Sequence, residues 1–373
     1  MAKLFLLCLL LSFTPKAQAR NPLKLTTFNA GLAHTYVPHA KERIPHLLSA
    51  LQNHSTDVLC LQEVWLKKDR KKFLKGLQQN FPYSFSSRIE QLKSKRRPTC
   101  KIGELFGKDK FVSCMRNLCG GLDGDEFTDC ILQKCGGALN SLVASNRECA
   151  SSLMAQVGKS SLMGLLAVLS PFKRAGLFAY KGSDGLLLLS RSPLVNTQKI
   201  DFSDISTLNR RVALTAEVDG QLIVCTHLTA DHGAEVPYTG KFKTWKDEHR
   251  AQVERLLYNV AKKDQPSAIL GDFNCGPKVT NLGIQGELSK SCSLFKMAGH
   301  KNALFEFSPE CTFCAGNSLN DEDSGDKIID HIFVKNSFLG SAKILFKEPV
   351  LLKSGVKSNL SDHFGLQIEV MPR

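Results

Sequence analysis

Short apolar runs recur along the chain and alternate with polar segments. Runs of roughly four to eight apolar residues bounded by Gly, Pro, Asn or Asp are typical of buried strands. We expect strands at residues 23–29, 58–62, 186–190, 212–218, 222–228, 268–270, 328–335 and 364–370. The dipeptide Asp219-Gly220 separates two of these runs and is a strong signal for a hairpin turn.

Two segments between the expected strands carry a helical period instead. They are residues 41–52 and 247–262. In the second, apolar residues follow the i, i+3, i+4, i+7 spacing at Val253, Leu256, Leu257 and Val260. Strands with helices between them predict a layered α/β fold.

The first residues have the order of a secretory signal peptide. Lys3 precedes an apolar run at residues 4–13, and small residues follow at Ala17 and Ala19. We therefore predict that residues 1–19 are a signal peptide and that the protein is secreted or periplasmic. The apolar run is shorter than the roughly 18 residues of a membrane span, and no comparable run follows, so no transmembrane helix is expected.

The chain is strongly basic, with a formal charge of +14 that falls to +12 when Lys3 and Lys16 leave with the signal peptide. Such a surplus favours acidic partners, namely nucleic acid, anionic membrane surfaces or phosphorylated substrates. A basic surface that serves only solubility is an equally good interpretation.

The cysteine content fits an exported protein. Only Cys8 of the 13 cysteines lies in the signal peptide, and an even 12 remain in a compartment where disulfides persist. Cys60 and Cys225 lie inside apolar runs and are interpreted as small hydrophobic residues. Six others cluster, which predicts a cysteine-rich insertion at residues 93–176: Cys100, Cys114, Cys119, Cys130, Cys135 and Cys149.

The insertion contains a weak internal repeat in which two Cys-x4-Cys units each run into Gly-Gly. Each unit is interpreted as a helical turn ended by glycine and linked to its twin by disulfides. A zinc site is the alternative, but the five-residue step does not match zinc-ligand spacing. Residues 161–172 are apolar on nearly all sides. This pattern is typical of a buried helix, which is the preferred interpretation, or of a segment that contacts a membrane.

Polar residues suited to metal chemistry follow several expected strands. Asn29 and Glu63 each close an apolar run, and Asp272 and Asn274 follow another where it enters a Gly-Pro turn. Side chains at strand ends face the mouth of a sheet, and carboxylate oxygens are preferred by Mg²⁺. In isolation, Asp272 and Asn274 would be better explained as turn formers.

Histidines and carboxylates recur in the same kind of position. His227 ends one expected strand, Asp330 interrupts another, and Asp362-His363 stands before the last. A carboxylate beside an imidazole fixes its tautomer and raises its basicity, as general acid–base catalysis requires. A single histidine is more often structural, so the hypothesis depends on their recurrence together.

Six motifs occur in one order: TFN at Asn29, LQEVW at Glu63, THL at His227, GDFN at Asp272, IDHI at Asp330 and SDH at His363. In this the chain resembles the endonuclease/exonuclease/phosphatase superfamily, which includes deoxyribonuclease I and neutral sphingomyelinases. The resemblance implies a four-layer α/β sandwich, in which two packed mixed sheets are flanked by helices. It covers residues 20–373 as one catalytic domain, interrupted by the cysteine-rich insertion.

The resemblance also implies a metal-dependent phosphoric diester hydrolase. Glu63 would bind Mg²⁺, with Mn²⁺ or Ca²⁺ as alternatives, and Asn29 would complete the metal site. Asp272 and Asn274 would position the attacking water and the phosphate.

Two histidines would share the proton transfers. His363, oriented by Asp330 or Asp362, would act as a base or stabilise charge, while His227 would protonate the leaving oxygen or stabilise the phosphorane. Which histidine is the acid stays open.

Within the superfamily the pattern is most similar to neutral sphingomyelinases, at residues 181–193, 226–231, 249–252 and 360–363, although His331 departs from it. This favours a phospholipid head group as substrate and peripheral membrane contact. The alternative is a nuclease acting on DNA or RNA, supported by basic clusters at residues 67–72 and 93–97. A binding protein without catalysis is disfavoured because all the site positions carry suitable residues.

Overall fold

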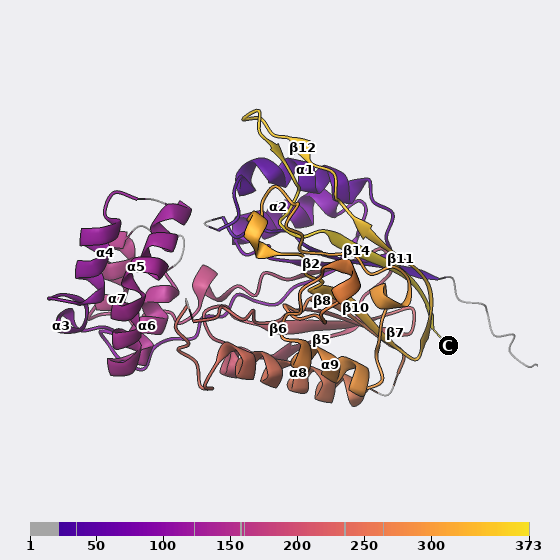
Figure 1. Ribbon diagram of the computed structural model, residues 1–373. Coiled ribbons are helices and arrows are strands. Elements are labelled where there is room, and N and C mark those ends of the chain that lie inside the picture. The colour runs from indigo at the N-terminus through magenta and orange to yellow at the C-terminus, as the bar shows by residue number, and fades with distance from the viewer. Residues whose placement is uncertain are drawn as a thin grey trace, which may run out of the picture.

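The computed structural model describes residues 22–372, except residues 35, 123, 157, 158, 160, 235 and 264. The predicted signal peptide at residues 1–19 lies outside the described residues. Figure 1 shows two stacked sheets with helices outside them and a separate group of helices on one side.

Each of the two large sheets has six strands and mixes parallel with antiparallel pairs. The first sheet has the order β11 (Ser337–Leu345), β14 (Gly365–Pro372), β1 (Leu23–Asn29), β2 (Val58–Gln62), β4 (Leu187–Ser190) and β3 (Tyr83–Phe85). The second has the order β5 (Val195–Asp201), β6 (Val212–Val218), β7 (Gln221–His227), β8 (Ser267–Asp272), β10 (Asp330–Lys335) and β9 (Lys301–Asn302). A small ribbon is formed by β12 (Val350–Leu351) and β13 (Lys357–Ser358).

Helices cover the outer face of each sheet and confirm the four-layer sandwich. α1 (Ala40–Gln52) and α2 (Lys67–Leu77) pack on the first sheet, and α8 (Trp245–Ala261) and α9 (Ser289–Met297) pack on the second. The inner faces of the two sheets share one apolar core. Single-turn helices lie in the connections: η1 (Ala179–Gly182), η2 (Ser203–Ile205), η3 (Thr280–Leu282), η4 (Leu304–Glu306) and η5 (Glu322–Ser324).

The hairpin expected at Asp219-Gly220 joins β6 to β7. Both residues have positive φ, 49° and 79°. This backbone suits the two-residue turn whose twist matches the strands it connects.

The structure corrects the interpretation of Cys60 and Cys225 as unpaired hydrophobic residues. They form a disulfide between β2 and β7, with a Cα–Cα distance of 5.4 Å. Both side chains point into the core between the sheets, so the apolar runs indicated their burial but not their proximity. The bond therefore links the two sheets through the centre of the sandwich.

The cysteine-rich segment forms a helical unit with its own apolar core. Its helices are α3 (Ile102–Leu105), α4 (Phe111–Cys119), α5 (Gly124–Ser145), α6 (Arg147–Met154) and α7 (Ser161–Leu169). Three nested disulfides connect Cys100 to Cys149, Cys114 to Cys135 and Cys119 to Cys130. Paired sulfurs leave no thiolates for the zinc alternative.

The prediction drawn from the internal repeat is confirmed for the disulfides and wrong for the end of one helix. Two disulfides join the repeat units as expected, and Gly120 follows the end of α4. Gly136 and Gly137, however, lie inside α5. The long helix continues through them because Leu139 and Leu142, beyond the two glycines, are buried in the core of the unit.

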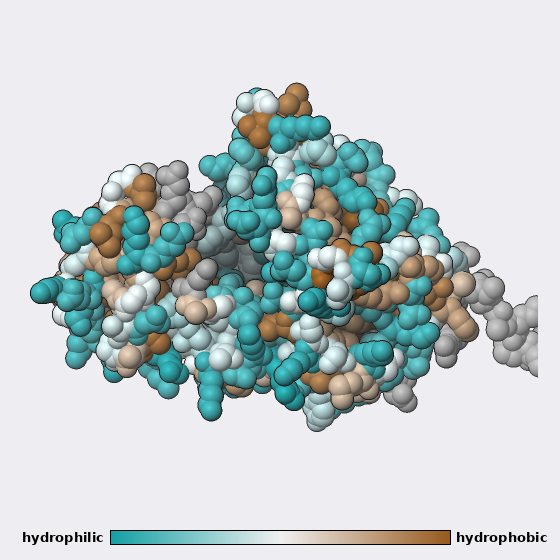
Figure 2. All heavy atoms as spheres, viewed as in Figure 1, coloured by the Kyte–Doolittle hydropathy of each residue, from teal (hydrophilic) through white to brown (hydrophobic). Residues whose placement is uncertain are grey.

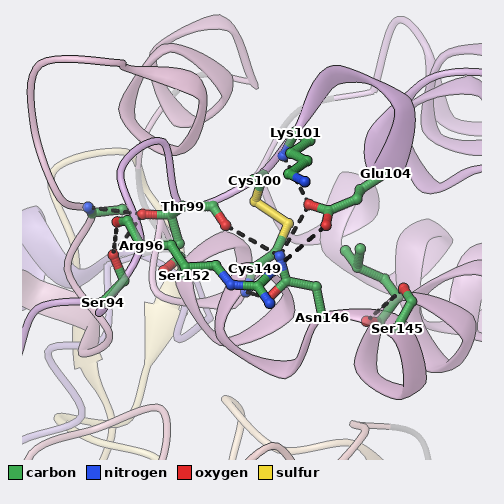
Figure 3. Close-up of a disulfide and its surroundings, with 12 residues drawn as sticks. Ser94, Arg96, Thr99, Cys100, Lys101, Glu104, Ser145, Asn146, Cys149 and Ser152 are labelled. Atoms are coloured by element: carbon green, nitrogen blue, oxygen red, sulfur yellow. Dashed lines mark hydrogen bonds and ion pairs between the residues drawn. A yellow bond between two sulfur atoms is a disulfide. The ribbon is translucent and has the colours of Figure 1, made fainter.

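The helical unit leaves and rejoins the sandwich at one place. Ser94 N donates to Ala175 O at 3.0 Å, and Leu177 N donates to Leu92 O at 2.8 Å. Just beyond them lies the Cys100–Cys149 disulfide (Figure 3).

Asn146 connects the parts around that disulfide. In Figure 3 its side chain reaches both the carbonyl of Thr99, at 3.2 Å, and the carboxylate of Glu104, at 3.0 Å. Its own oxygen accepts from Cys149 N at 3.1 Å and so caps α6. The entry to the unit is thus held by a covalent bond and by a satisfied polar network.

The expectation of a buried helix at residues 161–172 is only half correct. Val168 is buried in the helical unit, but Leu162, Met163 and Leu166 are 67%, 57% and 57% exposed. Phe172, just after α7, is 83% exposed. One face of α7 completes the unit's core while the other presents large apolar side chains to solvent.

Two further disulfides, Cys275–Cys292 and Cys311–Cys314, pair the last of the 12 cysteines. Within the described part of the chain, no helix combines the length and the apolar character needed to cross a membrane.

Candidate active site

The strand ends bring the predicted site residues to one edge of the sandwich. Asn29 ends β1 opposite Gln62, so Glu63 directly follows that pair. On the second sheet Asp272 ends β8, paired with His227 on one side and with Asp330 on the other. Because β1 and β2 pack against β7 and β8, the two groups face each other across the sandwich.

Asp272 is at the centre of the group and is almost fully buried. Its Oδ2 accepts a hydrogen bond from Asn29 Nδ2 at 2.9 Å and lies 3.3 Å from His227 Nε2 and 3.8 Å from His363 Nε2. Its Oδ1 accepts from Asn274 N at 2.8 Å. Burial alone would raise the pKa of Asp272, but the two imidazoles hold it below its ordinary value, so the side chain stays a carboxylate.

His363 pairs with Asp330, which decides between its two predicted partners. His363 Nδ1 lies 2.8 Å from Asp330 Oδ2. Asp362 instead accepts from Ser361 Oγ at 3.0 Å. Burial raises the pKa of Asp330 to about 6. Burial opposes the charged imidazole, but the surrounding carboxylates, Asp330 first, raise the pKa of His363 well above its ordinary value.

His227 has the opposite electrostatic environment. Burial and the nearby Arg211 cation lower its pKa to about 4, so the imidazole is neutral. Its Nε2 lies 3.2 Å from Asn274 Nδ2, which also donates to Leu228 O at 3.0 Å. Its Nδ1 has no hydrogen-bond partner among the described residues. The two site histidines therefore differ in charge.

Glu63 stands in a left-handed backbone conformation, with φ of 59°. Such strain in a non-glycine residue is often found at functional sites. Burial, and then repulsion from Asp362 and Asp272, raises the pKa of Glu63 to about 7. A divalent cation would relieve that repulsion, and the carboxylates together with the Asn29 amide are the oxygen donors that Mg²⁺ prefers. The residues around Glu63 thus fit a metal ion.

Another set of residues, Asp272, Asp330 and His363, has its ligand atoms within 4.8 Å of one another. Its members already bind each other, and a protonated imidazole cannot coordinate a metal. The Glu63–Asn29 side of the site is therefore the better candidate for the cation.

Arg211 belongs to the site and was missed in the sequence. It is 4% exposed, and its Nε and Nη1 have no hydrogen-bond partner among the described residues. Its charge acts on Glu63 and Asp272, and its guanidinium lies 5.6 Å from the ring of Trp65. The chain has 49 Lys and Arg residues, and nothing in the sequence distinguishes Arg211 from the others. Its burial and its lack of hydrogen-bond partners are seen only in the structure.

Trp65 and Tyr180 form an aromatic wall beside the catalytic residues. Their rings stack at 4.9 Å with an interplanar angle of 11°. The Trp65 ring lies 5.9 Å from the ring of His227. The motif around Glu63 therefore supplies an aromatic surface as well as a carboxylate.

Other motif residues support the site from behind. His249 Nε2 lies 2.8 Å from Phe273 O, and Gln252 Oε1 accepts from Thr229 N at 3.0 Å. His331 is buried, with Nε2 2.7 Å from Cys275 O. These side chains hold the loops after β7 and β8 through the backbone groups they contact.

A family model for the endonuclease/exonuclease/phosphatase family matches residues 26–363. No functionally curated protein sequence matches the chain.

Solved structures share the fold at low sequence identity. An endonuclease/exonuclease/phosphatase from Beutenbergia cavernae aligns over 95% of this chain and 72% of its own, with a TM-score of 0.51 and 15% identity. TDP2 from D. rerio, in complex with a single-strand DNA product, aligns over 94% and 99%, with a TM-score of 0.51 and 12% identity. SmcL also aligns over 94% and 99%, with a TM-score of 0.51 and 13% identity.

Proposed function

Because the chain belongs to the endonuclease/exonuclease/phosphatase family, whose members are hydrolases acting on phosphodiester bonds, we propose that it is a secreted, Mg²⁺-dependent phosphodiesterase of phospholipid head groups. The observation that carries the proposal is the position of Asp272. Its carboxylate lies near two imidazoles of different charge, accepts a hydrogen bond from Asn29 Nδ2 and repels the carboxylate of Glu63.

Each group then has a chemical task in hydrolysis. A cation at Glu63 and Asn29 would neutralise phosphate charge and acidify a water molecule. Asp272 accepts a hydrogen bond from the attacking water and orients it toward phosphorus. The protonated His363, held by Asp330, supplies positive charge and a proton at the scissile phosphate.

Arg211 and His227 complete the phosphate pocket. The unpartnered guanidinium nitrogens of Arg211 are donors for non-bridging phosphate oxygens, in a site where burial makes such hydrogen bonds strong. Neutral His227 and Asn274, whose side chains lie 3.2 Å apart, add further polar contacts. Water attack breaks the bond from phosphorus to the leaving oxygen and releases an alcohol and a phosphomonoester.

The exposed apolar face of α7 favours a lipid substrate over a soluble one. A surface of Leu162, Met163, Leu166 and Phe172 suits contact with acyl chains. Export is supported by the pairing of all 12 cysteines of residues 20–373, since disulfides persist outside the reducing cytosol.

A substrate panel tests the proposal. Purified protein is assayed on sphingomyelin, phosphatidylcholine, DNA, RNA and a soluble phosphodiester, with Mg²⁺ and with EDTA. We expect phosphomonoester release from phospholipid and from the soluble ester, both abolished by EDTA. Asp272→Asn should lower turnover by about 10²–10⁴-fold without changing the melting temperature, while the exposed Asp323→Asn serves as the matched control.

A secreted nuclease is the second candidate. It is favoured by the likeness to TDP2 with a DNA product and by the lysines on α2. Degradation of DNA with intact lipid in the same panel would establish it in place of the lipid proposal.

A further inference from the structure

A cleft of about 1560 Å³ separates the helical unit from the sandwich. One wall comes from α7 and the segment after it, with Met163, Leu166 and Phe172. The opposite wall comes from the starts of α1 and α2. In Figure 2 the surface is hollowed between the helical unit and the main body.

The charge of this cleft is strongly one-sided. Its lining has one carboxylate, Glu42, and eight basic side chains: Lys41, Lys67, Lys68, Lys93, Lys159, Lys173, Arg174 and Lys181. Among the residues that the structure describes, none of these eight has a carboxylate partner within 4.0 Å. Lys159 shows the resulting repulsion, because burial and then Lys181 and Lys93 lower its pKa.

Apolar and basic residues are arranged together at the rim. Phe172, 83% exposed, directly precedes the exposed Lys173 and Arg174. The exposed side of α7 lies on the same wall. Large apolar side chains next to cations are typical of surfaces that enter the boundary between lipid head groups and acyl chains.

The cleft leads toward the catalytic group. Tyr180 lines the cleft and stacks on Trp65, and the Trp65 ring adjoins both His227 and Arg211. A lipid held in the cleft would therefore have its head group separated from His227 by the stacked rings of Tyr180 and Trp65.

We propose that this cleft, together with the exposed face of α7 beside it, docks the protein on an anionic phospholipid membrane. Leu162, Met163, Leu166 and Phe172 enter the acyl region, and the surrounding lysines and Arg174 bind the head groups. The inference rests on the proposed function, since a lipid substrate gives such a surface its use. Nucleic acid is less favoured because a polyanion in water makes no use of exposed aliphatic side chains.

Vesicle co-sedimentation of the oxidised mature chain tests the inference. Phosphatidylcholine vesicles are compared with and without phosphatidylserine. Wild type should bind the anionic vesicles, and binding should weaken as salt is added. Lys173→Glu with Arg174→Glu should weaken binding by about fivefold or more for each residue. Leu162→Ser with Met163→Ser and Phe172→Ser should remove most of the remaining binding.

Matched controls come from α9, on the far side of the second sheet. Met297 is 78% exposed and supplies the apolar control Met297→Ser. Lys290→Glu with Lys296→Glu supplies the charge control. All variants should keep the melting temperature and their activity on a soluble phosphodiester, because the changed side chains lie on the surface and outside the catalytic group.

The outcomes separate the two proposals. Equal vesicle binding by the α7 variant and the α9 controls would overturn the docking surface. So would binding of single-stranded DNA, lost in the Lys173 and Arg174 variant, without any vesicle binding. Absence of activity on every phosphodiester in the panel would instead overturn the proposed function, whatever the vesicles show.

Discussion

At the scale of single residues, the site depends on two histidines in opposite electrostatic environments. His363 lies among carboxylates that favour its protonated form, whereas His227 lies beside Arg211 and is neutral. The sequence does not distinguish the acid from the base, because each histidine lies at or beside the end of an expected strand in a similar motif. The charges of their neighbours favour His363 as the proton donor.

Asp330→Asn should change the pH dependence of turnover in a definite direction. The Asp330 carboxylate stabilises the His363 cation, so a neutral amide should lower the pKa of His363. If the cation is the active form, the alkaline limb of kcat moves to lower pH, and kcat falls by about 10²-fold or more. The measurement is a pH–rate profile on a soluble phosphodiester at saturating Mg²⁺, with Asp323→Asn as control. A shift of the acid limb alone would show that His363 acts as a base.

The neighbours Arg210 and Arg211 should respond in different ways to replacement by methionine. Arg211 has two unpartnered nitrogens and no carboxylate within 4.0 Å among the described residues, so Arg211→Met should change the melting temperature far less than Arg210→Met while kcat/KM falls by about 10²–10³-fold. Arg210 is fully buried and binds Glu90 at 3.1 Å, Asp201 at 3.4 Å and Asp184 at 3.5 Å. Arg210→Met should destabilise the fold by about 3–5 kcal/mol because it leaves carboxylates uncompensated.

Thermal unfolding and steady-state kinetics of both variants check this pair. A large loss of stability in Arg211→Met, with normal kcat/KM in the folded fraction, would show that Arg211 is structural.

At the scale of helices and strands, the predictions succeeded where burial is strong. Each of the eight expected strands exists, with bounds that differ by at most a few residues, because central strands carry continuous apolar runs. The edge strands β5 and β11 were not predicted, since most of their residues are exposed or only half-buried. The sequence of β5 is largely polar, and in β11 glycine, serine and lysine interrupt the apolar residues. The order of the strands within each sheet could not be predicted from the sequence, because many neighbouring strands come from segments far apart in the chain.

In the candidate site too, features set by local burial could be predicted, and contacts between distant segments could not. Strand ends could be predicted from where apolar runs stop, and this located Asn29, Glu63 and Asp272. The choice of Asp330 over Asp362 as the partner of His363 depends on side-chain directions after folding. So does the bond between Cys60 and Cys225.

Removing the inter-sheet disulfide should destabilise the sandwich far more than removing a local one. Cys60 and Cys225 are 165 residues apart, whereas Cys311 and Cys314 are 3 apart. In the chain-entropy account a longer closed loop restricts the unfolded state more, and typical effects are about 2–4 kcal/mol. Denaturant unfolding of Cys60→Ala/Cys225→Ala and of Cys311→Ala/Cys314→Ala measures the difference. Similar losses in both variants would contradict it.

At the scale of the whole molecule, the carboxylates around Glu63 oppose folding in the absence of a cation. The pKa of Glu63 is raised to about 7, so its ionisation in the folded state carries a free-energy cost above its ordinary pKa. A cation bound only to the folded protein would offset this cost.

Magnesium should therefore raise the melting temperature more at one unit above pH 7 than at one unit below it, because protons compete with the cation at Glu63. The apparent affinity should fall by up to about tenfold per pH unit below that pKa, about 1.4 kcal/mol. Calorimetric titration and thermal unfolding at both pH values measure it, with the exposed Glu322→Gln as control. A magnesium effect independent of pH would place the cation elsewhere.

The hydrogen bonds between Ser94 and Ala175 and between Leu177 and Leu92 bear on how such a protein can diversify. The two ends of the helical unit lie side by side. Closing the unit into the sandwich therefore costs little more conformational entropy than closing a short loop would, whatever the length of the unit. The helical unit can then be exchanged, enlarged or lost as a module while the sheets and the catalytic group stay unchanged. Substrate range and bond cleavage are thereby open to separate selection, and to separate engineering.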